Sequence, residues 1–344
     1  MSSTPAVVDL GSARRARRLR FWLRRGGASL IGIAALGGVL VLLNPAKVGA
    51  ALAHFNLALA PAILALYVLI YVFQGARWHG LLVESGARLK LADSVLLNAA
   101  GQAITALVPL GDLTRALFAS QAAGQSFGKI AATVTVQELS YTMMLVLLAL
   151  PVVLTHHLGV AVVVITVAGM VGVVVILTVS RVFCFVHGVI ARIPLMRKLL
   201  PAIHELHHGT ADLLHRPETL AWTVLDLARA ATAVTVFWLL VQGLSPHTFT
   251  WTDAGFVLAV STIGGAISLI PGGVGANEAG VAGLLLLFGV GAGPAGAAAL
   301  IQRALMTGLA LLFGYSAYRL ERTRFRLGGL FQVTTRNERS AAAA

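Results

Sequence analysis

Two similar stretches interrupt apolar segments of the chain: residues 107–111 read LVPLG, and residues 269–273 read LIPGG. Proline lacks the N–H donor that a regular helix needs, and glycine leaves the backbone free to adopt other conformations. Irregular backbone at membrane depth is tolerated only where protein or a water-filled cavity satisfies its polar groups. In a chain that spans a membrane, the two stretches therefore predict broken helices beside a polar cavity.

The composition indicates a membrane protein. The 344 residues are 58% apolar and 11% charged, whereas roughly 25% of the residues in an average soluble domain are charged. These values exclude a soluble globular enzyme, a disordered regulator and a coiled coil. The single cysteine, Cys184, excludes a disulfide framework and a cysteine-based zinc site. The net charge of +13 is spread between apolar runs, so we expect no nucleic-acid partner.

Runs of about 20 mostly apolar residues predict helices that span the bilayer. The runs are continuously apolar, which does not fit the alternating pattern of a β-barrel. The broken stretches occupy residues 94–127 and 254–293 and predict two re-entrant or broken-helix hairpins. Six full spans are expected, at residues 28–43, 59–76, 131–155, 158–180, 219–243 and 296–318.

The distribution of lysine and arginine predicts the orientation, because cytoplasmic loops carry an excess of both. Basic residues fill segments 1–27 and 321–344, and Arg77 and Arg115 are assigned to the same side. Lys47 is the single basic residue expected outside. We therefore expect an inner-membrane protein of bacterial type with both termini in the cytoplasm.

The first apolar run resembles a signal sequence, since an arginine-rich segment precedes it and Ala51-Leu52-Ala53 resembles a cleavage site. The site lies some distance beyond the run, which favours an uncleaved signal anchor. A cleaved signal peptide is the alternative, and it leaves the rest of the topology unchanged.

The two interruptions align at an offset of 162 residues. Three predicted spans separate them, so one hairpin enters from the inside and the other from the outside. This is the arrangement of an inverted repeat in which discontinuous helices meet near the middle of the bilayer. The repeated halves are expected around residues 94–155 and 254–318.

Several ionisable residues fall in or beside the apolar segments, where each costs roughly 2.5–3.5 kcal/mol and needs a partner or a function. Asp226 and Arg229 are three residues apart, which predicts a structural ion pair on one helix face, although charges near a helix end can also reach the interface. Asp112 and Arg115 have the same spacing after the first break, where freed amides can receive an anion. Glu138 is a further candidate.

Glu278 follows the glycine-rich segment 271–276, which permits positive φ and close approach to the backbone. With Arg303 it can form a buried ion pair or contact a lipid headgroup. In the alternative interpretation, Asn277 caps a tight turn and Glu278 lies at a helix N-terminus, where a negative charge is favourable.

The region between residues 181 and 217 is expected to be a cytoplasmic loop. Residues 194–216 within it predict an interfacial amphipathic helix whose leucines face lipid. Residues 204–208, HELHH, match the spacing of a zinc-protease helix, but no separate third ligand stands out. We expect no metal and no cofactor.

Three segments together resemble the lysylphosphatidylglycerol synthase transmembrane-region family, which is also described as flippase-like. They are PLGDLTRA at 109–116, PGGVGANEA at 271–279 and QRA at 302–304, and the resemblance covers residues 28–320 as a single domain. In two-domain members the membrane region moves aminoacylated phosphatidylglycerol between leaflets, and a soluble domain makes that lipid. The resemblance implies lipid translocation. The chain departs from the family pattern at Asn277 and at Leu139.

These observations lead to one hypothesis and two alternatives. The hypothesis is translocation of a phospholipid, an aminoacylated lipid or an isoprenoid-type lipid through a polar cavity between the hairpins. The alternatives are a non-catalytic subunit that recruits a lipid- or glycan-modifying enzyme, and a membrane-embedded transferase, which would need a general base. The expected substrate-binding residues are Asp112, Arg115, Glu138, Gly272, Gly273, Gly275, Asn277, Glu278 and Arg303.

Overall fold

A computed structural model describes residues 37–38, 41–105, 112–155, 200–245, 249–268 and 273–325, together with single positions between 164 and 183. The elements in these ranges are all helical. The all-α fold class expected from the sequence is thereby confirmed for the described part of the chain.

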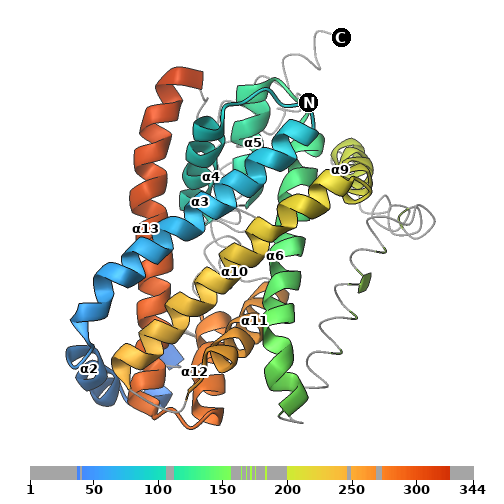
Figure 1. Cartoon of the computed structure of the whole chain (residues 1–344). Coiled ribbons are helices and arrows are strands. Elements are labelled where there is room, and N and C mark those ends of the chain that lie inside the picture. Colours follow the sequence, from blue (N-terminus) through green and yellow to red (C-terminus); the bar gives the residue numbers. More distant parts are fainter. Residues whose placement is uncertain are drawn as a thin grey trace, which may run out of the picture.

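Four long helices form the frame of the molecule (Figure 1). Each is long and apolar enough to cross a membrane, judged by length and composition, and the chain is a multi-pass membrane protein. They correspond to four of the six predicted spans, while the other two, 28–43 and 158–180, lie almost entirely outside the described residues. The four are α3 (Ala60–Glu84), α6 (Phe127–Thr155), α10 (Pro217–Leu244) and α13 (Ala292–Phe325).

The two broken stretches form pairs of short helices that pack against each other. The first pair is α4 (Leu91–Thr105) with α5 (Asp112–Ala123), and the second is α11 (Trp251–Ile267) with α12 (Ala276–Leu287). Residues 106–111 and 269–272, which hold the prolines, lie outside the described residues. At about 1.5 Å per residue, none of these four helices reaches the roughly 30 Å of a bilayer core.

The two hairpins occupy opposite ends of the molecule (Figure 1). Helices α4 and α5 lie at the upper end, where α6 begins, and α11 and α12 lie at the lower end, where α13 begins. Each hairpin also packs on a long helix that is distant in sequence, because α4 lies along α13 and α11 lies along α6. Helices α3 and α10 pack on each other and run side by side, diagonally across the molecule (Figure 1).

Local sequence explains where several helices begin. Thr250 caps α11 and, with Asp253, forms a capping box in which each side chain accepts from the other's backbone N–H. Helices α3 and α10 have proline in the first turn, where the missing N–H is not needed. At the lower end, the short helices α2 (Pro45–Ala53) and η1 (Leu57–Leu59) lead into α3.

Small residues allow the close packing of the short helices on the long ones. A Cβ placed on Gly314 of α13 would lie 2.4 Å from the carbonyl oxygen of Ala99 in α4. Within the first hairpin, a Cβ on Gly101 would lie 2.3 Å from the Cβ of Arg115. Side chains cannot be added at either position without moving a helix.

Helix α9 (Leu200–Leu214) lies in the segment predicted to be an amphipathic interfacial helix, but three of its leucines, Leu206, Leu213 and Leu214, contact protein. Leu213 is buried in an apolar cluster with Leu81, Ala132 and Val136, and Leu206 packs against the same cluster. The prediction that these leucines face lipid is therefore wrong. Amphipathic spacing defines an apolar face, and here α6 covers that face where lipid was expected.

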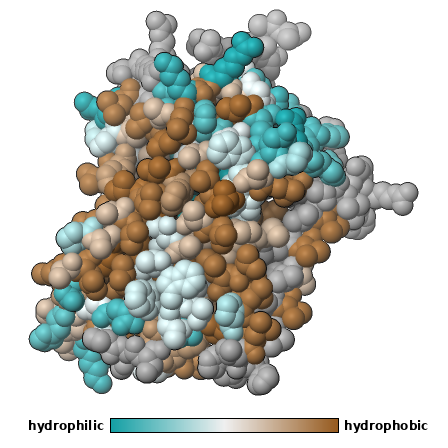
Figure 2. Space-filling model, in the orientation of Figure 1, coloured by the Kyte–Doolittle hydropathy of each residue, from teal (hydrophilic) through white to brown (hydrophobic). Residues whose placement is uncertain are grey.

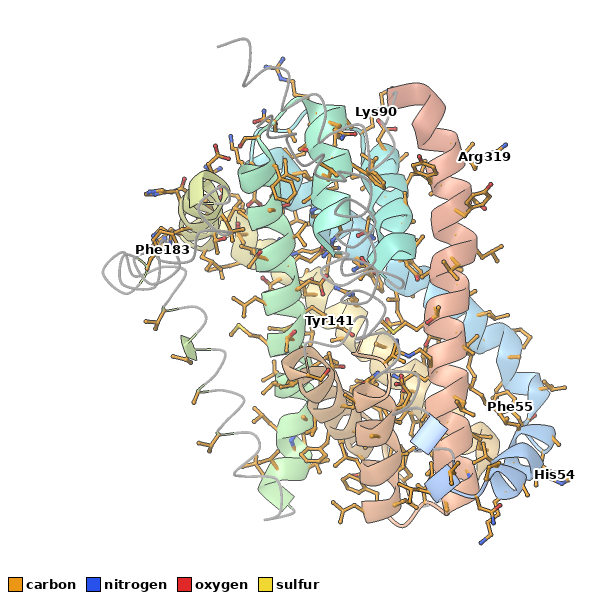
Figure 3. All side chains as sticks on the ribbon, turned by 180° about the vertical axis from the view of Figure 1, so that it is seen from behind. His54, Phe55, Lys90, Tyr141, Phe183 and Arg319 are labelled. Carbon is orange, nitrogen blue, oxygen red and sulfur yellow. The ribbon has the colours of Figure 1, made fainter. Side chains whose placement is uncertain are left out.

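The surface agrees with a membrane location. Hydrophobic residues cover the middle of the face seen in Figure 2, and hydrophilic residues gather toward its ends. In Figure 3, Lys90 and Arg319 lie at one end of the molecule and His54 and Phe55 lie at the other, with Tyr141 about midway between them.

Candidate functional site

Arg115 forms the centre of a buried polar cluster. It lies in the first turn of α5 and has 0% of its side chain exposed. Its Nη1 donates to Asn98 Oδ1 at 2.8 Å and to Gln137 Oε1 at 3.0 Å, and its Nη2 donates to Glu138 Oε1 at 2.5 Å. The guanidinium also lies 5.7 Å from the ring centroid of Trp78. Side chains from α3, α4 and α6 therefore hold this arginine in one orientation.

Glu138 connects Arg115 to a second arginine. Its Oε1 lies 3.6 Å from Nη1 of Arg229, which comes from α10. The Arg229 guanidinium lies over the ring of Tyr141, 3.8 Å from the ring centroid. Because Tyr141 is midway along the molecule (Figure 3), this contact is at mid-depth. The side chain of Glu138 is 33% exposed, so the cluster is open on the glutamate side.

Three neutral amides of this cluster were not predicted from the sequence: Gln74, Asn98 and Gln137. Gln137 Nε2 donates to the backbone carbonyl of Gln74 at 2.6 Å. When the Gln74 amide is oriented with its oxygen toward the arginines, that oxygen accepts from Arg229 Nη2 at 3.0 Å. The available signal was the occurrence of uncharged hydrogen-bonding side chains inside apolar helices, where each needs an internal partner.

Arg77 and Asp226 form an ion pair that the sequence assigned differently. Arg77 Nε donates to Asp226 Oδ2 at 2.8 Å, and the two side chains are 1% and 0% exposed. Arg77 was expected in a cytoplasmic loop, but α3 continues to Glu84 and buries it. The predicted pairing of Asp226 with Arg229 on one helix face is also corrected.

The reason for this correction is the position of α10 between two neighbours. Residues three apart on a helix share a face, but that face of α10 is flanked by both α3 and α6. Asp226 reaches Arg77 on α3, whereas Arg229 reaches Glu138 on α6. Both ion pairs therefore join helices to each other. Arg77, Arg115, Glu138, Asp226 and Arg229 are called the first charge cluster below.

Glu278 and Arg303 form the second charge cluster. Glu278 is in the first turn of α12, and its Oε2 accepts from the backbone N–H of Gly275 at 2.5 Å. Its Oε1 accepts from Arg303 Nε on α13. The side chains are 2% and 13% exposed. The expected ion pair and the expected position of Glu278 at a helix N-terminus are thus both present in one arrangement, but Gly275 and not Asn277 is the N-cap residue.

The glycines before α12 have the backbone conformation that was expected of them. Gly273 and Gly275 have φ values of 63° and 85°, in the left-handed region that favours glycine. A Cβ on Gly273 would lie 3.2 Å from the Cα of Gly265, so the close approach seen here is between the turn before α12 and helix α11. Contact of these glycines with a lipid stays a prediction. Gly272 lies outside the described residues, as does the side chain of Asp112.

Each charge cluster is built in the same way with the sign of the charge reversed. Arg115 lies in the first turn of the second helix of the first hairpin and pairs with Glu138 on the next long helix. Glu278 lies in the first turn of the second helix of the second hairpin and pairs with Arg303 on the next long helix. Asn277 lies beside Glu278, and its Cβ is 3.3 Å from the position of a Cβ on Gly265.

Chemically, the two clusters offer charged and amide groups for recognising a polar headgroup. Among the described residues, no group of three histidine, cysteine, aspartate or glutamate side chains is placed to hold a metal ion. His207, within the HELHH segment, is buried and stacks on Phe183 with ring centroids 3.8 Å apart.

Comparison with known proteins gives one match. A family model described as lysylphosphatidylglycerol synthase TM region matches residues 29–314. The matched range contains both hairpins and both charge clusters. No curated protein and no solved structure matches the chain.

Proposed function

Since the chain belongs to the lysylphosphatidylglycerol synthase TM region family, we propose that it moves a lipid between the two leaflets of the bacterial inner membrane. The substrate is a phospholipid, an aminoacylated lipid or an isoprenoid-type lipid, and its headgroup passes the two charge clusters. The observation that carries the proposal is a set of five charged side chains, buried or partly buried, near the first turns of α5 and α12: Arg115, Glu138, Arg229, Glu278 and Arg303.

The direction of the helices supports an inverted repeat of two halves. Helices α3 to α6 form one half and α10 to α13 form the other, and corresponding helices run in opposite directions (Figure 1). In each half, the first short helix packs on the last long helix of the other half: α4 packs on α13, and α11 packs on α6. In such a repeat the hairpin tips approach the middle of the membrane from opposite sides.

A headgroup can cross the bilayer at this place because polar groups replace part of its hydration. An ionised group in the hydrocarbon core is costly unless it meets opposite charge or hydrogen-bonding partners. The acyl chains stay in lipid, where the hydrophobic middle of the molecule offers an apolar surface (Figure 2). Movement down a concentration difference between leaflets needs no further energy source.

Reconstituted vesicles test the proposal. The purified protein should speed the movement of a fluorescent phospholipid from the inner to the outer leaflet, measured by chemical quenching from outside. Glu278→Ala and Arg303→Ala should both abolish this movement while still inserting in the membrane, because each removes one half of the second charge cluster. Glu205→Ala is the matched control, since Glu205 is exposed on α9.

Unchanged lipid movement in both variants contradicts the site assignment. Absence of lipid movement in the wild-type protein, combined with stable copurification of a soluble enzyme, would favour the recruiting subunit instead. Product formation by the purified protein would favour a membrane-embedded transferase.

A further inference from the structure

We infer that Glu138 is an exchangeable counterion: the phosphate of a lipid headgroup takes its place beside Arg115 and Arg229. The inference rests on the proposed function and specifies how the substrate is held. It assigns anion binding to the first charge cluster and not to the second.

The first argument is the position of one carboxylate between two arginines. Asp226 is engaged with Arg77 at 2.8 Å in a fully buried pair. Glu138 contacts both Arg115 and Arg229, and it does so with the same oxygen atom, Oε1. An anion that replaces this carboxylate would therefore lie beside both guanidinium groups.

The second argument is that the arginine donor is buried and held in place, whereas the Glu138 carboxylate that accepts from it is partly exposed. Arg115 is fully buried and is held by Asn98 and Gln137 in addition to Glu138. Its Nε is buried and has no hydrogen-bond partner among the described residues. Glu138 is 33% exposed, so its carboxylate is the member of the cluster that an entering group can reach. The donors stay in place while the acceptor can be exchanged.

The third argument is the chemistry of the donors. A guanidinium is planar and offers parallel N–H groups that match the geometry of a phosphate or a carboxylate. The nearby Tyr141 ring supports the Arg229 guanidinium from one side. A phosphodiester can thus replace the carboxylate with the same type of charge-assisted hydrogen bond.

In the second charge cluster, the carboxylate is not accessible to an entering anion in this way. Glu278 is 2% exposed, and each of its two oxygens is engaged, Oε2 by the N–H of Gly275 and Oε1 by Arg303. The charges of Glu278 and Arg303 cancel. An anion that approached Arg303 would have to remove a buried carboxylate that the backbone also holds. Arg115 and Arg303 were both expected to bind substrate, and the geometry favours Arg115 together with Arg229 for the phosphate.

The test is equilibrium binding to the full-length protein in detergent, measured by titration calorimetry. The probes are a short-chain phosphatidylglycerol, a short-chain phosphatidylcholine and inorganic phosphate. Glu138→Gln keeps the shape and the hydrogen-bonding oxygen but removes the competing charge. It should bind phosphatidylglycerol about tenfold more tightly than the wild-type protein does. Glu205→Gln, which makes the same change on the exposed face of α9, should bind as the wild type does.

An affinity of Glu138→Gln for phosphatidylglycerol that equals or falls below that of the wild type would overturn the inference. Arg229→Gln is the second variant, and it should weaken binding by about tenfold, since a charge-assisted partner is lost. Unchanged binding in Arg229→Gln would overturn the inference even if Glu138→Gln did not fold. Elution volume and helical circular dichroism confirm the fold of each variant.

The three probes identify the source of the phosphate. Tighter binding of phosphatidylglycerol than of inorganic phosphate assigns the site to a lipid headgroup, and equal binding assigns it to a free anion. Phosphatidylcholine shows whether a neighbouring positive charge on the headgroup weakens the contact. The binding measurement needs no lipid transport. The predicted changes in affinity can therefore be observed even if the protein moves no lipid in vesicles, and lipid movement can be observed even if the affinities do not change.

Discussion

Several buried charges in the described part of the protein contact opposite charges that come from other helices. Arg77 of α3 meets Asp226 of α10, and Arg115 of α5 meets Glu138 of α6. Such pairs add little net stability compared with apolar residues of the same size, but removal of one partner leaves a buried charge without compensation. Single substitutions and paired substitutions should therefore have different effects.

We expect Arg77→Ala and Asp226→Ala each to destabilise the protein by about 3–5 kcal/mol, because each leaves a buried charge without its partner. The double substitution Arg77→Leu with Asp226→Leu should be less destabilising than either single change. The measurement is the fraction of protein that stays monodisperse after heating in detergent. Arg319→Ala, at an exposed position near the end of α13, is the control. A double variant less stable than both single variants would contradict the prediction.

At the scale of the helix, the contacts that the short helices make with each other and with the long helices depend on the absence of side chains. Gly314 of α13 and Gly101 of α4 face neighbouring atoms at distances that exclude a Cβ. Other glycines on the same or neighbouring helices face open space, including Gly308 and Gly283. The chain therefore contains matched pairs of glycines for substitution.

We expect Gly314→Ala to weaken the packing of α13 on α4, since the new Cβ would lie 2.4 Å from the carbonyl oxygen of Ala99. Gly308→Ala lies on the same helix with nothing within 4 Å and should be neutral or stabilising by up to about 1 kcal/mol. Thermal stability of the two variants in detergent gives the comparison. Equal thermal stability of Gly314→Ala and Gly308→Ala would contradict the prediction, because it would mean that the close packing of α13 on α4 does not contribute to stability.

A separate prediction concerns the turn before α12, where glycine has a positive φ. Gly273 has a φ of 63°, and alanine in this conformation costs roughly 1–2 kcal/mol. Gly273→Ala should therefore lower thermal stability and lipid movement together, because the same turn positions Glu278. Gly283→Ala, within α12 and facing open space, should lower neither property. A Gly273→Ala variant as active and stable as its Gly283→Ala control would contradict this account of the turn.

At the scale of the whole molecule, the two ends differ in charge. Lys90 and Arg319 mark the end that holds α4 and α5, and His54 lies at the opposite end (Figure 3). An excess of basic residues identifies a cytoplasmic side. The charge distribution therefore predicts which end of the molecule faces the cytoplasm.

Thiol labelling tests this orientation in intact cells. The chain has one cysteine, Cys184, which Cys184→Ala removes. In that background, His54→Cys should react with a membrane-impermeant maleimide from outside, whereas Lys90→Cys should react only after the cells are opened. The reverse pattern would mean that the orientation inferred from the basic residues is wrong.

The amino-acid sequence was sufficient for the features that depend on neighbouring residues in the chain. Apolar runs identified the membrane class and the approximate positions of α3, α6, α10 and α13, because the length of such a run is a local property. Proline and glycine marked the ends of the short helices for the same reason. The motifs PLGDLTRA and PGGVGANEA pointed to the family that the chain belongs to.

The partners of the buried charges needed the folded molecule. Asp226 and Arg229 share a face of α10, yet Asp226 contacts α3 and Arg229 contacts α6, and the amide of Gln74 joins the cluster from α3. Residue spacing defines which side chains share a helix face, but it carries no information about which neighbouring helix covers each part of that face. That depends on the packing of the long helices and hairpins against each other, which brings residues more than a hundred positions apart in the chain within hydrogen-bonding distance.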